Sequence, residues 1–229
     1  MRSLVLSDVH ADPGALERVL DDVAGRWDRL LLLGDLIGYG GAPVAVVRRL
    51  RDLRPVAAVR GNHEAMAAEL LAGRRPRAAE AIVATLQAHA DALDDDDLAW
   101  LMDLPERAVA APAVEGDPGV ALAHGHPDPA RPFDYLLGVP AARRAAAHMA
   151  RPITFVGHTH VPGGFLEAGG RWRPVPARKT ETVVAVPPGA RAFLNPGSVA
   201  AARDGGAGAC YLVFDHGRRE ATFRRVGTG

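Results

Sequence analysis

The chain has 229 residues, 48% of them hydrophobic and 24% charged, which suits a protein with one sizeable core and excludes a disordered chain. Its 27 Lys and Arg residues equal its 27 Asp and Glu residues in number, so no overall positive field attracts nucleic acid or an anionic membrane. Cys210 is the only cysteine, and every apolar run is too short for a secretion signal or a membrane span. We therefore expect a cytoplasmic protein with a single domain over residues 1–229, no membrane partner and no extended nucleic-acid surface.

The beginning of the chain alternates short apolar runs with amphipathic stretches. We predict strands over residues 3–7, 29–33 and 55–59, separated by helices over 14–25 and 43–53. Short apolar strands joined by helices are typical of a parallel sheet that is covered on both faces. Ligands bind beyond the carboxyl ends of such strands, so the polar residues that follow these three strands are expected to lie side by side.

The middle of the chain has a helical pattern. Residues 64–102 are Ala-rich, and a break at 73–76 divides them into two helices, which we interpret as a cap-like segment. The acidic run at 94–97 is interpreted as a helix start, because acidic side chains favour the first turn and consecutive side chains point in different directions.

From residue 107 onward the pattern is mostly that of β-structure. We predict a hairpin, a helix and then a series of strands, over residues 108–114, 119–123, 140–149, 153–156, 165–167, 182–186, 192–194, 210–214 and 221–226. The later strands alternate with Gly and Pro turns, as antiparallel strands do. The expected fold class is mixed α/β, in which a mainly antiparallel sheet from the second half packs against the first sheet, with helices outside.

Six of the nine histidines directly follow predicted strands, beside Gly or Asp: His10, His63, His124, His126, His158 and His160. Histidine and carboxylate together form the ligand set for Mn, Fe or Zn, and the lack of paired cysteines argues against a structural zinc site. Asp8 and His10 are two residues apart, so on an extended strand end both side chains point to one side and can hold one ion. The remaining histidines, His89, His148 and His216, are interpreted as surface residues.

Glycines precede three further polar residues. Gly34 comes before Asp35, and Gly61 comes before Asn62 and His63, so the backbone can turn sharply after each strand and approach a site closely.

These blocks resemble the calcineurin-like metallophosphoesterases. That family has D-x-H, GD, GNH with a following acidic residue, a strand-terminal His and GHTH, and the same five blocks occur here in the same order. One block alone is weak evidence, whereas five in order are strong. The resemblance covers nearly the whole chain and implies a four-layer double β-sandwich flanked by helices.

The resemblance also implies a site with two divalent metal ions, manganese first, with iron, zinc, nickel and cobalt as alternatives. The first ion would be held by Asp8, His10, Asp35 and His160, and the second by Asp35, Asn62, His124 and His158. Asp35 would then bridge the pair and serve the reaction directly. His63 would be the other catalytic residue, bonding the phosphate or protonating the leaving oxygen, and Glu64 would orient it.

The implied activity is hydrolysis of a small phosphate monoester or diester by metal-activated water, with nucleotides as one substrate class. The alternative is a non-catalytic scaffold or binding protein on the same fold, which would be expected to lack Asp35, Asn62 or His63. A nucleic-acid-binding module built on Arg74, Arg75 and Arg77 is disfavoured by the zero net charge. The native metal, the physiological substrate and the oligomeric state stay open.

The chain departs from the family pattern at residues 11 and 12, at His126 and in the segment after Ser198, which lacks the usual Gly-Gln-Pro. Asp12 is interpreted as the cap of the helix that begins near Pro13, with a substrate contact as the alternative. His126 is a candidate substrate contact or proton donor. Arg203, which the family pattern keeps in that segment, is a candidate for binding a substrate phosphate, with a salt bridge to Asp204 or another neighbour as the alternative.

Overall fold

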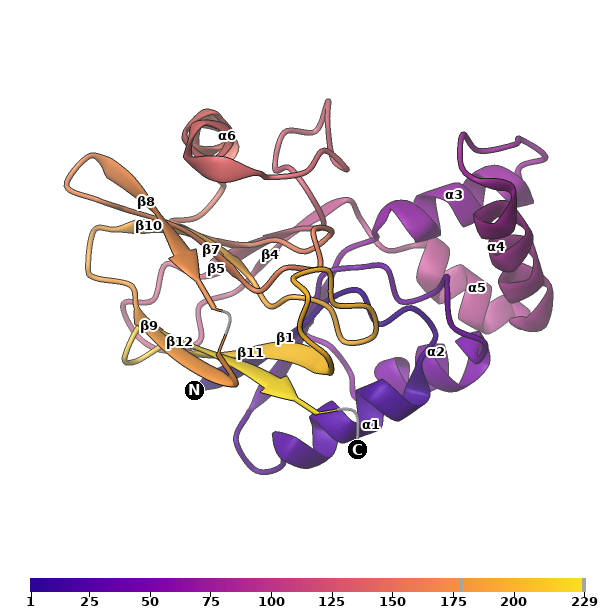
Figure 1. Ribbon diagram of the computed structural model, residues 1–229, viewed down its shortest axis with the longest axis horizontal. Helices are drawn as coiled ribbons and strands as arrows, with labels where there is room; N and C mark the ends of the chain where they lie inside the picture. Colours follow the sequence, from indigo (N-terminus) through magenta and orange to yellow (C-terminus); the bar gives the residue numbers. More distant parts are fainter. Residues whose placement is uncertain (178, 228–229) are drawn as a thin grey trace.

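A computed structural model describes residues 1–177 and 179–227, and it contains two mixed β-sheets with helices on their outer faces (Figure 1). The expected mixed α/β sandwich is thereby confirmed. The first sheet has the strand order β3-β2-β1-β11-β12-β9, with bounds Ala57–Ala58, Arg29–Leu32, Arg2–Leu6, Ala209–Asp215, Glu220–Val226 and Glu181–Ala185. Strands β1, β2 and β3 run parallel, as the sequence predicts.

The second sheet has the order β4-β5-β6-β10-β7-β8, with bounds Arg107–Ala110, Val120–Ala123, Ile153–Phe155, Arg191–Asn195, Gly163–Ala168 and Arg171–Pro176. The predicted hairpin is the antiparallel pair β4–β5. Strands β5, β6 and β10 are parallel, so this sheet is mixed too.

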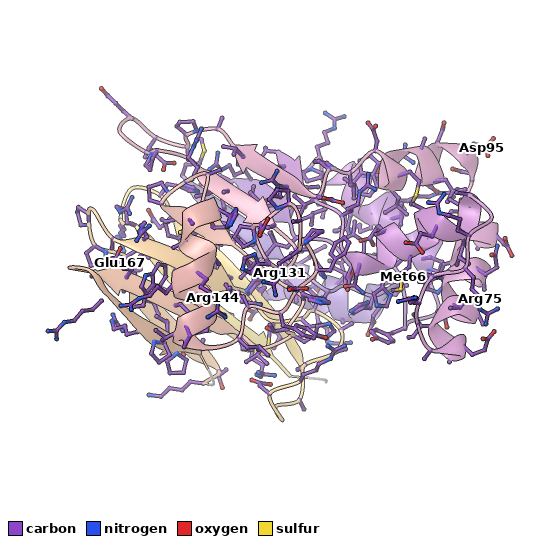
Figure 2. The ribbon with its side chains drawn as sticks, turned by 90° about the horizontal axis from the view of Figure 1, so that it is seen from above. Met66, Arg75, Asp95, Arg131, Arg144 and Glu167 are labelled. Atoms are coloured by element: carbon purple, nitrogen blue, oxygen red, sulfur yellow. The ribbon has the colours of Figure 1, made fainter. Side chains whose placement is uncertain are left out.

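Helices form the outer layers. Helices α1 (Pro13–Asp22) and α2 (Pro43–Asp52) cover the first sheet, while α6 (Gly138–Ala145), continued by a short 3₁₀ helix (Ala146–His148), covers the second. Helices α3 (Asn62–Leu71), α4 (Glu80–Ala92) and α5 (Asp95–Met102) form the helical segment. It has three helices where two were expected, because the chain is extended at Leu93 and the acidic run at 94–97 starts a third helix. Seen from above, Met66, Arg75 and Asp95 of this part lie at the end of the molecule opposite Glu167 of β7 (Figure 2).

Two cores explain the continuous apolar strands near the N-terminus. Leu4 and Leu30 face the helices, whereas Val5 and Leu31 face the other sheet and pack with Phe155 and its neighbours. All four leucine and valine side chains are buried. A strand that is buried on both faces shows no polar alternation, which is why these strands read as unbroken apolar runs.

One prediction about the sheets is wrong, and one strand lies outside the predicted ones. The second half does not form a sheet of its own, because β9, β11 and β12 join the first sheet, where β11 pairs antiparallel with β1. Strand β8 was not predicted, because Pro174 and Pro176 argue against a strand. It lies at the edge of its sheet, where a missing N–H can face outward.

Candidate metal centre

The candidate ligands lie on loops that follow the strands of both sheets. Asp8, His10, Asp35, His158 and His160 all have positive φ angles, between 49° and 66°. This left-handed conformation is uncommon for residues other than glycine and is found at functional sites where the surrounding structure holds it. The extended arrangement expected for Asp8 and His10 is therefore wrong, and tight left-handed turns aim these side chains instead.

A first group of side chains, Asp8, His10, Asp35 and His160, meets in the buried interior. One ligand atom from each lies within 4.8 Å of all the others. His160 Nε2 is 3.1 Å from Asp8 Oδ1 and 3.3 Å from His10 Nε2, while His10 Nε2 is 4.0 Å from Asp35 Oδ2. The structure thus brings together the four residues assigned from the sequence to one ion.

A second group shares Asp35 with the first. Asp35, His124 and His158 also have ligand atoms within 4.8 Å of one another. His124 Nε2 is 3.3 Å from Asp35 Oδ2, 3.1 Å from His158 Nδ1 and 3.2 Å from Asn62 Oδ1. All seven predicted ligands therefore converge, with Asp35 between the two groups.

The hydrogen bonding of the site suits cations. His10, His124 and His160 each use Nδ1 to bond a backbone carbonyl, of Ile37, Leu33 and Ala201 respectively, at 3.1, 2.6 and 2.5 Å. Each ring therefore directs Nε2 into the site, as in metal centres, where a hydrogen bond to one ring nitrogen orients the other toward the ion. Among the described residues, Asp8 Oδ1 and Asp35 Oδ2 are buried without a hydrogen-bond partner. Buried carboxylate oxygens left in this way fit metal ions.

The buried carboxylates and imidazoles of the site shift one another's pKa values. Burial alone would raise the pKa of Asp8 and Asp35, but the facing imidazoles outweigh it and lower both, that of Asp35 well below its usual value. For the His124 imidazole burial acts in the opposite direction and would lower the pKa, yet the Asp35 charge outweighs it and raises the pKa to about 9. For His10 and His158 burial dominates and lowers the pKa to about 4.

His63 and Glu64 begin α3 beside this site. The backbone N–H of His63 donates to Asp35 Oδ1 at 2.9 Å. The His63 ring packs against the His10 ring with 4.8 Å between centroids. The Glu64 carboxylate does not orient His63 as expected. It accepts instead from the N–H groups of Asp35, Leu36, Ile37 and Gly61, at 2.7 to 3.2 Å. Glu64 thereby fixes the loop after β2.

Gly61 shows why this loop needs glycine. A Cβ placed on Gly61 would lie 2.0 Å from Asp35 Oδ1, well inside any permitted contact. The N-terminus of α3 and the bridging aspartate can approach this closely only if residue 61 has no side chain.

Two histidines assigned to the surface are buried. His89 of α4 accepts from Gly38 N–H through Nδ1 at 3.1 Å and bonds Gly40 O through Nε2 at 2.9 Å, so α4 supports the loop beside His63. His216 bonds Asp117 at 2.8 Å and Ser3 at 2.8 Å. A lone histidine gives no sequence signal for such partners. His148 is exposed, as expected.

The other candidate residues, Asp12, His126 and Arg203, lie outside the two ligand groups. Asp12 Oδ1 accepts from Ala15 N–H at 2.8 Å and caps α1, which confirms the preferred interpretation. His126 is buried and accepts from Asp128 N–H at 3.1 Å. The alternative pairing of Arg203 with Asp204 is wrong, because Asp204 pairs with Arg225.

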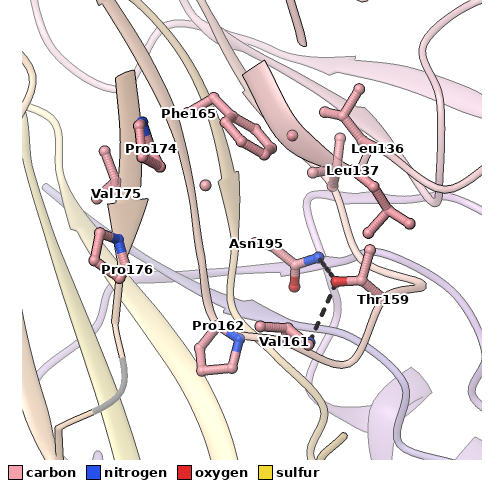
Figure 3. A pocket seen from close by; sticks show the side chains of 13 residues that line it. Leu136, Leu137, Thr159, Val161, Pro162, Phe165, Pro174, Val175, Pro176 and Asn195 are labelled. Carbon is pink, nitrogen blue, oxygen red and sulfur yellow. Dashed lines mark hydrogen bonds between the residues drawn. The ribbon is translucent and has the colours of Figure 1, made fainter. Parts of the chain in front are cut away.

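A separate cavity of about 270 Å³ adjoins the loop that carries His158 and His160 (Figure 3). It is lined mainly by apolar side chains of the loop before α6 and of β7 and β8, with Thr159 and Asn195 hydrogen-bonded at 3.0 Å. Among the described residues, none of the seven ligands lines it. This cavity is therefore not the metal centre.

Comparison with known proteins decides the family. The profile of the calcineurin-like phosphoesterase superfamily domain matches residues 1–218. The chain belongs to this superfamily. It is similar to a metallophosphoesterase from Sphaerobacter thermophilus, with 32% identity, a TM-score of 0.79, and coverage of 99% of this chain and 88% of that one.

Two further relatives of this phosphoesterase domain differ in how closely they match. An uncharacterized protein of Methanocaldococcus jannaschii is 29% identical over 214 residues, which are 92% of this chain and 81% of the relative. A solved structure of a candidate diadenosine tetraphosphatase has 19% identity and a TM-score of 0.57, and the match covers 100% of this chain and 95% of that one. The second match shows the shared fold alone.

Within the described residues, no helix combines the length and apolar character needed to cross a membrane.

Proposed function

We propose that this chain is a hydrolase that uses two divalent metal ions, with manganese as the first choice, to cleave phosphate monoesters or diesters. One observation carries the proposal: Asp35 belongs to both ligand groups, and its buried Oδ2 has no hydrogen-bond partner among the described residues. A carboxylate between two cations relieves their mutual repulsion.

The ligand assignment follows the two groups. Asp8, His10, Asp35 and His160 would hold one ion. Asp35, His124 and His158, with Asn62 Oδ1 beside His124, would hold the other. Nitrogen and oxygen donors without thiolate suit Mn, Fe, Zn, Ni or Co.

The chemistry is displacement at phosphorus. When bound, two divalent cations supply positive charge that lowers the pKa of water and neutralises the phosphate oxygens. The water gives one proton to solvent as its oxygen bonds to phosphorus, the bond from phosphorus to the leaving oxygen breaks, and that oxygen receives a proton from His63. Asp8 and Asp35, ionised because their pKa values are lowered, fix the charge of the site.

His63 is the proposed proton donor to the leaving oxygen. Its Nδ1 is buried and packs against Gly38, and its Nε2 lies 3.9 Å from Asp35 Oδ2, on the side of the ligand groups. The proton is therefore transferred from Nε2. General acid catalysis of this kind contributes about 10²- to 10⁴-fold to the rate.

The substrate class is a small phosphate ester, and nucleotides are included because a fold relative is a candidate diadenosine tetraphosphatase. The surrounding loops choose the leaving group, so the fold alone does not fix the substrate. A scaffold role is disfavoured, since Asp35, Asn62 and His63 are all present.

Activity measurements test the proposal. Manganese-loaded wild-type protein should hydrolyse p-nitrophenyl phosphate, its bis ester or a member of a nucleotide panel. His63→Ala should keep its metal but lose about 10²-fold or more in kcat, whereas His148→Ala, at an exposed histidine, should match the wild type. No hydrolysis of any of these compounds by the wild type would reject the proposal.

A further inference from the structure

Arg203 joins two tyrosines that stand over the metal centre. Its guanidinium donates to the Tyr135 hydroxyl at 3.2 Å and to the Tyr39 hydroxyl at 3.3 Å. Its backbone N–H donates to His160 O at 3.2 Å, which ties the residue to a ligand loop. Three distant segments of the chain thus meet at one guanidinium.

Both tyrosine rings contact imidazoles of the site. Tyr135 stacks on His158 with 4.2 Å between centroids and 14° between planes. Tyr39 packs edge-on against His10 at 4.5 Å and lies 4.9 Å from His63. The rings remain 47% and 48% exposed, whereas the ligands beneath are buried. Arg203 therefore stands at the mouth of the site, one aromatic layer outside the imidazoles.

The charge of Arg203 is not neutralised by a carboxylate in the described part of the chain. Asp204, its neighbour in sequence, pairs with Arg225 instead and also accepts from Gly206 N–H at 3.2 Å. The polar contacts of the Arg203 side chain are two neutral hydroxyls. A guanidinium held in this way keeps its charge and further N–H donors for an anion.

We propose that Arg203, positioned by Tyr39 and Tyr135, binds an anionic group of the substrate next to the scissile phosphate. The site thereby selects substrates that carry a second phosphate, because the scissile phosphate occupies the buried metal centre and its neighbour lies at the exposed mouth. Arginine binds phosphate through paired N–H donors, which gives both affinity and orientation. This inference rests on the proposed phosphoesterase function and names its substrate class.

Kinetics with two substrates test the inference. On manganese-loaded protein, Arg203→Ala should raise KM for ADP by about 10-fold or more, while kcat/KM for p-nitrophenyl phosphate changes by less than about threefold. The double variant Tyr39→Phe/Tyr135→Phe keeps both rings and should raise KM for ADP by a smaller factor. An equal loss on both substrates, or no loss on either, would overturn the inference.

A binding measurement separates this inference from the proposed function. By titration calorimetry, Arg203→Ala should weaken the binding of methylenediphosphonate by about 10-fold while leaving that of inorganic phosphate unchanged. This readout needs no turnover, so it decides the role of Arg203 even if the wild type hydrolyses neither substrate. Unchanged binding of methylenediphosphonate would show that Arg203 does not bind the second phosphate.

Discussion

Backbone contacts orient the histidines that we propose as metal ligands. Because Nδ1 of His10, His124 and His160 bonds a carbonyl, Nε2 of each ring is directed toward Asp8 or Asp35. His124 differs in charge, since the facing Asp35 raises its pKa to about 9. Without bound cations the His124 ring is therefore protonated on both nitrogens and positively charged at neutral pH. An imidazole that binds a metal must be neutral, so this ring has to lose one proton first.

Metal binding at neutral pH should release roughly one proton from His124. His10 and His158, with pKa values of about 4, are already neutral there and release none. The apparent affinity should rise with pH up to about 9, where His124 loses its proton unaided. Calorimetric titration of manganese in buffers of different ionisation enthalpy measures the release, and an identical heat in every buffer would contradict it.

At the residue scale, the sequence predicts contacts between neighbouring residues but not those between distant segments. Asp12 was identified as a cap because Asp before Pro is a complete signal within a few residues. The burial of His89, the backbone partners of Glu64 and the tyrosines around Arg203 depend on contacts between distant segments. No pattern near these residues in the sequence encodes such partners.

At the scale of elements, the loop after β2 shapes the environment of His63. Gly38 has a φ of +90°, and a Cβ there would lie 1.9 Å from His63 Nδ1. Gly41, in the same loop, has open space around its missing Cβ. Gly38 differs from Gly41 in both its crowded Cβ position and its left-handed φ, so alanine at the two positions serves as test and control for whether the loop positions the proposed proton donor.

Gly38→Ala should displace His63 and lower kcat by about 10²-fold, toward the level of His63→Ala, without loss of bound metal. Gly41→Ala should leave kcat unchanged. Steady-state kinetics combined with metal analysis and a thermal melt of each variant measure these effects. Equal kcat values for both variants and the wild type would show that the loop does not position His63.

Helices and strands could be predicted from the sequence where a single pattern of apolar residues dominates a segment. The parallel strands β1 and β2 and the helix α1 between them follow from apolar periodicity. Strand β8 was missed because its prolines are tolerated only at a sheet edge, and edge position is a property of the assembled sheet. The pairing of β11 with β1 was missed because alternation along a strand does not identify its partner.

At the scale of the whole molecule, the candidate metal centre lies where the two sheets meet. Asp8, Asp35 and Asn62 follow strands of the first sheet, whereas His124 and His158 follow strands of the second. The fold therefore completes the site only when both sheets are packed together. The order of the five sequence blocks was enough to predict this convergence, although the composition of each sheet was not.

Metal analysis of the whole protein tests the central claim most directly. After loading with manganese and removal of free metal, the wild type should contain about two ions per chain. Asp35→Asn should lose both ions and the activity together, because it weakens the ligand that the two groups share. A wild type that retains no manganese, or an Asp35→Asn variant that retains as much as the wild type, would contradict the bridged two-metal site.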